Sequence, residues 1–295
     1  MIIKPRAAWT AMALLLVLFV AAVQFSCRVL SVSADAPAEP ETVCVPIMVY
    51  HEVKPKLSSY VISPYEFESD LKFLKENHYT AITMTELIDF VCRDKGIPEK
   101  PIILSFDDGY LDNYKYVYPL LKKYNQKIVL SVIAKNTDDF TQVPDNNLTY
   151  SHMTWGQMKE IYDSGLVEIQ NHTYNLHSDK NGRIGCKQMR GESDAHYEQV
   201  LSEDLMKCQE EIRANIGATP NTFTYPYGES SKNTDGILKK LGFQATLTCK
   251  YGVNMVGKGQ NTLYGLKRIC RMHGVSLKKA LEEGMKTLKY QNGNG

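Results

Sequence analysis

Two short stretches of the sequence carry residues that could do chemistry. The first, SFDDGY (105–110), places Asp107 and Asp108 side by side after the apolar run PIIL. Burying adjacent carboxylates is costly unless a cation compensates their charge. Adjacent side chains point in opposite directions from a strand, and Gly109 would ease a bend, so one carboxylate could bind a metal while the other accepts a proton. A simple Asp-Gly turn is the alternative interpretation.

The second stretch, NHTYNLH (171–177), contains His172 and His177. A spacing of five places two histidines about 140° apart on a helix, so a shared metal would require a curled loop. One carboxylate and two imidazoles would leave a coordination position for water, as in catalytic zinc sites. Mixed nitrogen and oxygen ligands disfavour Mg²⁺ and Ca²⁺.

Short apolar strands alternate with helical patterns in the remainder of the chain, which predicts βα units around a parallel sheet. The expected strands are 46–51, 80–84, 101–106, 127–133, 166–171, 221–226 and 244–248. This pattern predicts a (β/α) barrel, with a doubly wound open sheet as the alternative. In both folds ligands bind at the carboxyl ends of the strands, where His51 and the Tyr225–Gly228 stretch also fall.

The predicted helices have clear start signals. Capping boxes begin at Ser63, Thr83 and Thr154, and the first is followed by a proline and by an apolar face of Phe67, Leu71 and Leu74. Further helices are expected over 202–216 and 234–241. Two polar segments, 135–153 and 178–196, are expected to connect elements near the ligand-binding end, and the second could shape a groove for a polymer.

The N-terminus predicts export. Lys4 and Arg6 precede an uncharged run over 7–25, which is long enough to span a hydrocarbon core. We therefore assign 1–30 as a signal-anchor or a cleaved signal peptide, and we favour an N-terminal hydrophobic helix that anchors the chain to the membrane. Residues 31–44 read as a linker, and 45–295 as the folded domain.

Composition excludes little else. The chain has 295 residues and a formal net charge of +1, which gives no reason to expect nucleic acid as a partner. Its seven cysteines lie singly, and they could form disulfides or serve as small buried residues.

SFDDGY, NHTYNLH and TYPYG, in that order, resemble the first three motifs of the polysaccharide deacetylases, the NodB-homology group or carbohydrate esterase family four. The stretches MVYHEV (48–53), 63–84 and LKRICR (266–271) resemble the branch of exported poly-N-acetylglucosamine deacetylases. The resemblance covers about 46–280. It implies a distorted (β/α)₇ TIM-like barrel and metal-dependent hydrolysis of N-acetyl groups on a sugar polymer.

The resemblance also implies a role for each motif residue. Asp108, His172 and His177 would hold Zn²⁺ or another divalent transition metal such as Co²⁺. Asp107 would be the base, and His51 the general acid. Tyr227 would contribute its backbone N–H to an oxyanion hole.

The sequence departs from the family pattern before PYG, where the usual arginine is missing. Arg268 or Arg271 could replace it, and His273 is a second candidate for the acid. We also expect four residues to contact substrate: Tyr225, Pro226, Gly228 and Arg268.

The resulting hypothesis is an exported metal-dependent deacetylase, membrane-anchored or secreted, that acts on N-acetylglucosamine-containing polysaccharide of a cell wall or extracellular matrix. A glycosidase that uses two carboxylates is one alternative, although such a pair must flank a sugar bond about 5–10 Å apart. A barrel that binds glycan without turning it over is the other.

Overall fold

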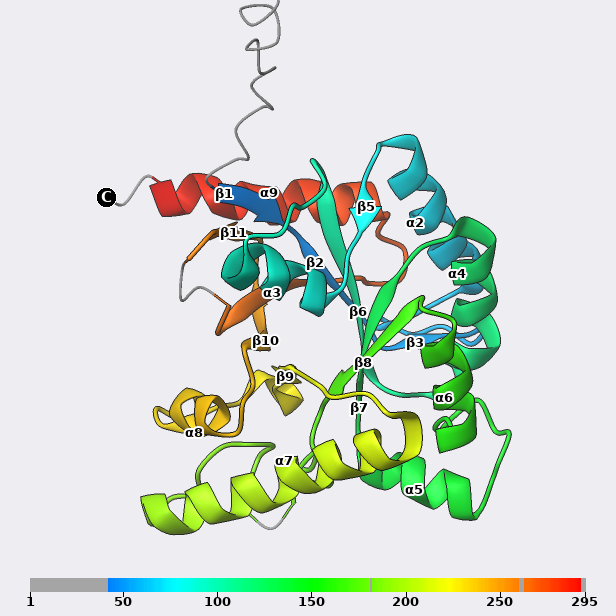
Figure 1. Cartoon of the computed structure of the whole chain (residues 1–295). Coiled ribbons are helices and arrows are strands. Elements are labelled where there is room, and N and C mark those ends of the chain that lie inside the picture. Colours follow the sequence, from blue (N-terminus) through cyan, green and yellow to red (C-terminus); the bar gives the residue numbers. More distant parts are fainter. Residues whose placement is uncertain (1–41, 181, 260–262, 293–295) are drawn as a thin grey trace, which may run out of the picture. The chain divides into compact units, whose positions relative to one another are not determined.

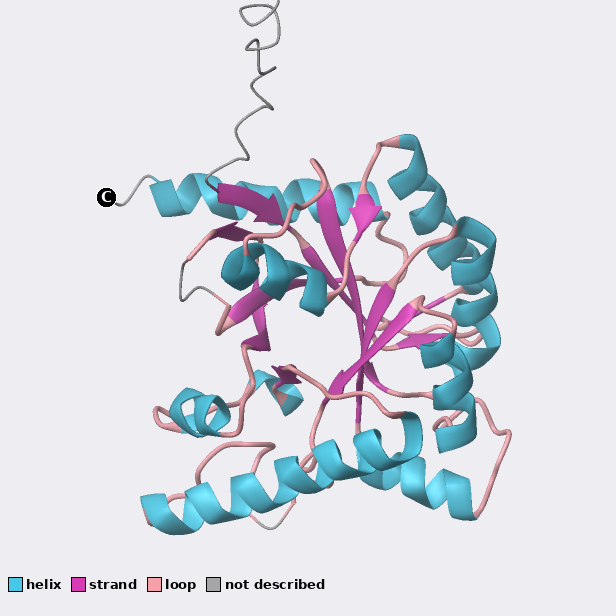
Figure 2. Cartoon of the chain, in the orientation of Figure 1, coloured by secondary structure: helices cyan, strands magenta, loops and turns pink. Residues whose placement is uncertain are grey.

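A closed ring of seven parallel strands forms the centre of the fold. The computed structural model describes residues 42–180, 182–259 and 263–292. Around the ring the order is β2-β12-β10-β9-β8-β7-β6, and β6 pairs back with β2. The bounds are β2 Ile47–Tyr50, β6 Pro101–Asp108, β7 Ile128–Val132, β8 Val167–Asn171, β9 Thr222–Thr224, β10 Ala245–Tyr251 and β12 Leu266–Cys270. The fold is therefore the expected α/β barrel, and Figure 2 shows its strands surrounded by helices.

One predicted strand lies outside this ring. β5 (Thr80–Ala81) pairs only with Pro101 and Ile102 at the start of β6, whereas β2 pairs with the next four residues of β6. The expected strand over 80–84 is thus a short edge strand, and β12 takes the seventh place. The eight residues of β6 are long enough to serve both neighbours in succession.

Small two-stranded sheets accompany the barrel. β1 (Thr42–Val45) runs antiparallel to β11 (Asn254–Gly257), and β3 (Glu52–Val53) pairs with β4 (Val61–Ile62). Because β1 begins at Thr42, the last residues of the segment expected to be a linker belong to the folded unit. The rest of that segment and the expected N-terminal helix lie outside the described residues.

Helices cover the outside of the strands, as Figure 1 shows. All three predicted capping boxes are present, at Ser63, Thr83 and Thr154. The bounds are α2 Pro64–Glu76, α3 Met84–Arg93, α4 Tyr118–Tyr124, α5 Ala134–Gln142, α6 Trp155–Asp163, α7 Asp194–Ile216, α8 Thr234–Lys240 and α9 Leu277–Asn292. Two single turns complete the set, a π-helical turn η1 (Asn113–Val117) and a 3₁₀ turn η2 (Pro226–Gly228).

Some helices were not expected from the sequence. The polar segment 135–153 contains most of α5, which has no side-chain cap and buries only Ala134 and Thr137. α7 begins eight residues before the expected start, because Ser193 accepts a hydrogen bond from the backbone N–H of His196 and caps it there. α9 was not predicted either, although Ser276 precedes it and accepts a hydrogen bond from the backbone N–H of Lys279.

The core fills the space between the strands and the helices. The predicted face of α2, Phe67, Leu71 and Leu74, is fully buried. Phe67 packs edge-on against both Tyr50 of β2 and Phe106 of β6. This packing fixes Tyr50 and Phe106, and the residues that follow these two in the chain are His51 and Asp107.

The structure contains neither disulfides nor membrane-spanning helices among the described residues. All six cysteines in this part of the chain are free thiols. Within the same residues, no helix has both the length and the apolar character needed to cross a membrane.

Candidate functional site

The three expected metal ligands lie together at the carboxyl ends of the strands. Asp108 is the last residue of β6, and His172 follows β8 directly. The Nε2 atoms of His172 and His177 are 3.4 and 3.5 Å from Asp108 Oδ1. One donor atom from each side chain lies within 4.8 Å of the others. The curled loop required by the spacing of the histidines is therefore present.

This donor set fits a divalent transition metal. Asp108 Oδ1 is buried and has no hydrogen-bond partner, so the protein leaves its lone pairs unused. Ligands about 2.0–2.1 Å from a tetrahedral zinc ion lie about 3.3 Å apart, which is close to the two separations seen here. His172 Nδ1 donates to the carbonyl of Thr224 at 2.8 Å, which leaves the Nε2 lone pair facing Asp108.

The electrostatics of the cluster follow from burial and mutual charge. Burial acts to raise the pKa of Asp108, but the neighbouring His172 and His177 lower it overall. Burial acts to lower the pKa of His172, yet the two aspartates raise it overall. Burial and the neighbouring His172 lower the pKa of His177. The ionised carboxylate and a neutral His177 are the protonation states that metal binding requires.

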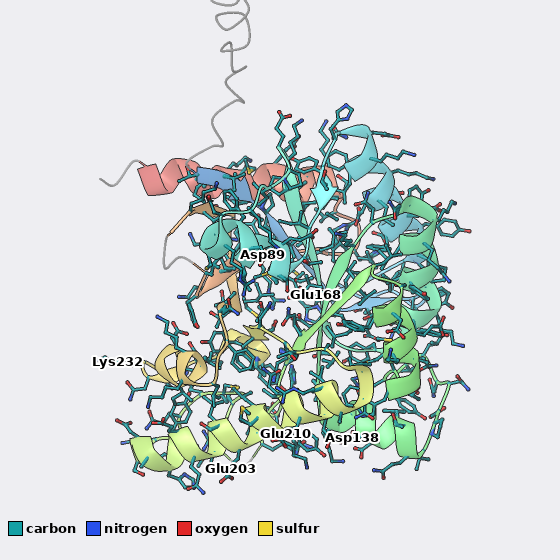
Figure 3. The ribbon with its side chains drawn as sticks, in the orientation of Figure 1. Asp89, Asp138, Glu168, Glu203, Glu210 and Lys232 are labelled. Atoms are coloured by element: carbon teal, nitrogen blue, oxygen red, sulfur yellow. The ribbon has the colours of Figure 1, made fainter. Side chains whose placement is uncertain are left out.

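Acidic residues from neighbouring helices hold the loop that carries both histidines. The backbone N–H groups of Tyr174 and Asn175 donate to the Asp204 carboxylate of α7, each at 2.8 Å. The Tyr174 hydroxyl donates to Asp138 of α5, which is labelled in Figure 3. Asp138 also accepts from the Trp155 indole at the start of α6. Two helices thus hold the loop directly and a third holds Asp138 in place, and sequence reasoning had identified none of these contacts.

Asp107 has a different partner from Asp108. Its Oδ1 accepts from Arg268 Nη1 at 2.8 Å, and both side chains are almost fully buried. Burial raises the pKa of Asp107, but the Arg268 charge and hydrogen bond contribute to an overall lowering. Arg268 also donates to the Thr248 carbonyl at 2.8 Å. Of the two candidates to replace the missing arginine, Arg268 is therefore the one that contacts Asp107, whereas Arg271 pairs with Asp70.

The expectation that Arg268 contacts substrate does not match this placement. Its side chain is only 1% exposed and is engaged by Asp107, Ser105 and the Thr248 carbonyl. Its geometry is that of a positioning residue for Asp107.

Backbone strain gathers at the site. Asp108, Thr173 and Tyr227 all have positive φ, of 73°, 80° and 57°. Such conformations cost non-glycine residues energy and persist only where the surroundings enforce them. At Asp108 one enforcing contact comes from His152, whose Nδ1 lies 3.0 Å from the Asp108 carbonyl oxygen.

The TYPYG stretch contributes one residue to the surface of the site. The Tyr227 ring lies 4.5 Å from the His177 ring and is half-exposed. Tyr225 and Pro226 are buried instead, and the Tyr225 hydroxyl donates to Asp235. Because both side chains are buried, neither is placed to make the substrate contact that we expected of it. Gly228, with φ of +70°, leaves room for Cys249, since a Cβ there would lie 2.7 Å from the Cys249 Cβ.

The two candidate acids have different surroundings. His51 follows β2, and its charge helps to lower the pKa of both Asp107 and Asp108. His273 instead lies on the surface, where its Nδ1 is 3.0 Å from a Glu66 carboxylate oxygen. The structure thus associates His51, and not His273, with the carboxylates.

Comparisons with known proteins show the family of the chain. A family model described as polysaccharide deacetylase matches residues 94–246. The Bacillus subtilis (strain 168) protein YxkH is 29% identical over 232 residues, which is 79% of this chain and 73% of that protein. The poly-beta-1,6-N-acetyl-D-glucosamine N-deacetylase of Escherichia coli (strain K12) is 26% identical over 229 residues, which is 72% of this chain. The chain matches only 34% of the length of that enzyme.

A solved structure is similar over most of the described chain. It is the structure of IcaB from Ammonifex degensii, with 29% sequence identity and a TM-score of 0.64. The match covers 76% of this chain and 91% of that one.

Proposed function

Because the chain belongs to the polysaccharide deacetylase family, we propose that it is a metal-dependent hydrolase that removes N-acetyl groups from N-acetylglucosamine-containing polysaccharide. Two similarities support this substrate class. One curated relative is a poly-beta-1,6-N-acetyl-D-glucosamine N-deacetylase, and the chain is similar to IcaB over three quarters of its length.

The observation that carries the proposal is that the adjacent carboxylates of Asp107 and Asp108 contact different partners. Asp108 faces two imidazoles, and Asp107 faces a guanidinium. Metal-assisted hydrolysis needs one carboxylate as a ligand and another that is free to take a proton. A strained strand end gives neighbouring residues these two environments.

We propose that Asp108, His172 and His177 hold the metal, which would be Zn²⁺ or another divalent transition metal such as Co²⁺. When bound, the ion would polarise the acetyl carbonyl and lower the pKa of its water.

The protein's own residues would then move the protons. Asp107, ionised and held by Arg268, would accept a proton from the attacking water. The backbone N–H of Tyr227 would donate to the developing oxyanion, and its strained turn would fix the direction of that donor. His51 would donate a proton to the leaving nitrogen, because an amine leaves poorly unless it is protonated.

Neither alternative function is favoured by a specific contact. In a glycosidase the two carboxylates would act as a pair across a sugar bond, whereas here Asp107 and Asp108 have separate partners. A glycan-binding barrel without turnover has no need for a buried, unpartnered ligand atom such as Asp108 Oδ1.

We further propose that the chain works outside the cytoplasm, anchored or secreted by residues 1–30, with 45–295 as the catalytic domain and a cell-wall or matrix glycan as its partner. The basic start and uncharged run of the N-terminus support this location.

Acetate release tests the proposal. The purified protein is stripped with a chelator, reloaded with Zn²⁺ or Co²⁺, and given N-acetylglucosamine oligomers of several linkages. We expect release that disappears on stripping and returns with metal. Oligomer binding without acetate release under any metal would support the binding barrel instead, and cleavage of the oligomer backbone would support the glycosidase.

A further inference from the structure

Asn113 is a buried polar residue near the site that the proposed mechanism does not use. It is the first residue of η1, the π-helical turn that follows the strand carrying Asp107 and Asp108. Single π-helical turns inside other structure occur often at functional sites. Asn113 is only 3% exposed; its amide nitrogen has protein partners, whereas its Oδ1 has none.

The side-chain amide of Asn113 reaches the segment that carries His51. Its Nδ2 donates to the backbone carbonyl of His51 at 3.1 Å and to Asp112 Oδ1 at 2.7 Å. Both partners are acceptors, so the amide orientation is fixed with its nitrogen toward them. Its backbone N–H donates to the Tyr110 carbonyl at 3.1 Å, which ties the same residue back to the SFDDGY stretch.

This contact matters because His51 stands in a gap between elements. β2 ends at Tyr50 and β3 begins at Glu52, so neither strand contains His51 itself. A proton donor must lie within hydrogen-bond distance of the leaving nitrogen, and a small displacement of such a group lowers the reaction rate strongly. The bond from Asn113 fixes the His51 backbone relative to the strand that carries the base.

We propose that Asn113 is a positioning residue for His51. It holds the proton donor relative to the stretch that carries Asp107 and Asp108, because its side chain bonds to the His51 carbonyl and its backbone N–H bonds to the Tyr110 carbonyl. This inference rests on the proposed function, since it assigns a task to the acid of that reaction.

Two substrates separate this role from a merely structural one. Hydrolysis of the N-acetyl amide requires a proton on the leaving nitrogen, whereas 4-nitrophenyl acetate releases a phenolate that needs none. We expect Asn113→Ala to lower kcat for the oligomer amide by about 10- to 100-fold. KM, bound metal and the rate on the ester should stay within about twofold of the wild type.

Gln209→Ala is the matched control. Gln209 is also buried, and its Nε2 also donates to a backbone carbonyl, that of Pro220 at 2.9 Å, but it lies on α7 and neither it nor Pro220 is a proposed site residue. This variant should lose stability while its ratio of amide to ester rates stays that of the wild type. If Asn113→Ala does not fold, Asn113→Ser, which retains a donor of smaller reach, provides the same comparison.

The double variant completes the test. His51→Ala alone should show the same selective loss on the amide, and His51→Ala with Asn113→Ala should be no worse than His51→Ala alone. Equal losses on amide and ester in Asn113→Ala, or additive losses in the double variant, would overturn the inference. A wild type that hydrolyses no amide would count instead against the proposed function.

Discussion

Arg268 and Asp107 form a buried ion pair, with Nη1 of the one 2.8 Å from Oδ1 of the other, although 161 positions separate them in the chain. Arg268 lies on β12 and Asp107 on β6, and these strands flank β2 in the ring. The pair therefore depends on closure of the barrel. It also keeps Asp107 ionised beside a second carboxylate.

Replacing Arg268 should lower the activity while the protein keeps its bound metal. In Arg268→Met, Asp107 loses its counter-charge in a buried environment, which we expect to cost about 3–5 kcal/mol of the free energy of unfolding. Acetate release should fall by about 100-fold or more, because the base loses its charge and its orientation. Chemical denaturation, metal content and acetate assays on the same preparation measure all three effects.

Arg271→Met is the matched control. Arg271 forms an equally buried pair with Asp70, but that pair involves none of the proposed catalytic residues. Arg271→Met should lose about as much free energy of unfolding as Arg268→Met and keep near-normal activity per folded molecule. If both variants lose activity equally at a temperature where both are folded, Arg268 has no special role.

A methyl group at Gly228 should disturb the turn of Tyr227. In Gly228→Ala the new Cβ would overlap Cys249 Cβ at 2.7 Å, at a φ of +70° that disfavours alanine. We expect a loss of about 1–3 kcal/mol in stability and a clear fall in kcat.

Gly217→Ala provides the comparison for that variant. Gly217 ends α7 at a φ of +79°, and nothing lies within 4 Å of the position of its Cβ. It should cost about 1 kcal/mol from backbone strain alone and leave kcat unchanged. A Gly228→Ala enzyme as active as Gly217→Ala would show that the turn does not contribute to catalysis.

Asp112 should make stability depend on pH. Burial and the charge of Glu52 raise the pKa of Asp112 to about 8 in the folded state, from the ordinary 3.8 of an aspartate. The folded protein thus binds this proton more tightly than the unfolded chain. The favourable contribution is fully present below about pH 4, is lost as pH rises towards 8, and stays lost above it.

Asp112→Asn should remove this dependence, because an amide keeps the acceptor for Asn113 without the charge. Thermal unfolding of both proteins at pH 5 and pH 8.5 checks this. The gain in Tm of the variant over the wild type should be larger at pH 8.5. A larger gain at pH 5 would contradict the assignment of a neutral Asp112.

Much of the site could be predicted from the sequence, because parallel strands gather their carboxyl ends at one edge. Asp108 and His172 each fall at a strand end, so the alternation of strands and helices was enough to bring them together. The choice between Arg268 and Arg271 could not be predicted. Arg268 lies within β12 and meets Asp107, whereas Arg271 follows the last residue of that strand and meets Asp70.

Other features depend on packing that leaves little local signal. The strand over 80–84 has a β-branched pattern, but its exclusion from the ring follows from how β6 divides its length between two neighbours. Asn113 lies in a π-helical turn, and the hydrophobic periodicity of a sequence does not predict such a turn. The contacts from Asp138 and Asp204 likewise reach backbone and hydroxyl groups far away in the chain.

The division of labour between Asp107 and Asp108 is tested most directly by measuring bound metal and acetate release together in Asp107→Asn and His172→Ala. We predict that Asp107→Asn keeps about one metal ion per chain and loses acetate release by at least about 100-fold. His172→Ala should lose the metal as well as the activity. Loss of metal in Asp107→Asn, or full acetate release by that variant, would contradict the account.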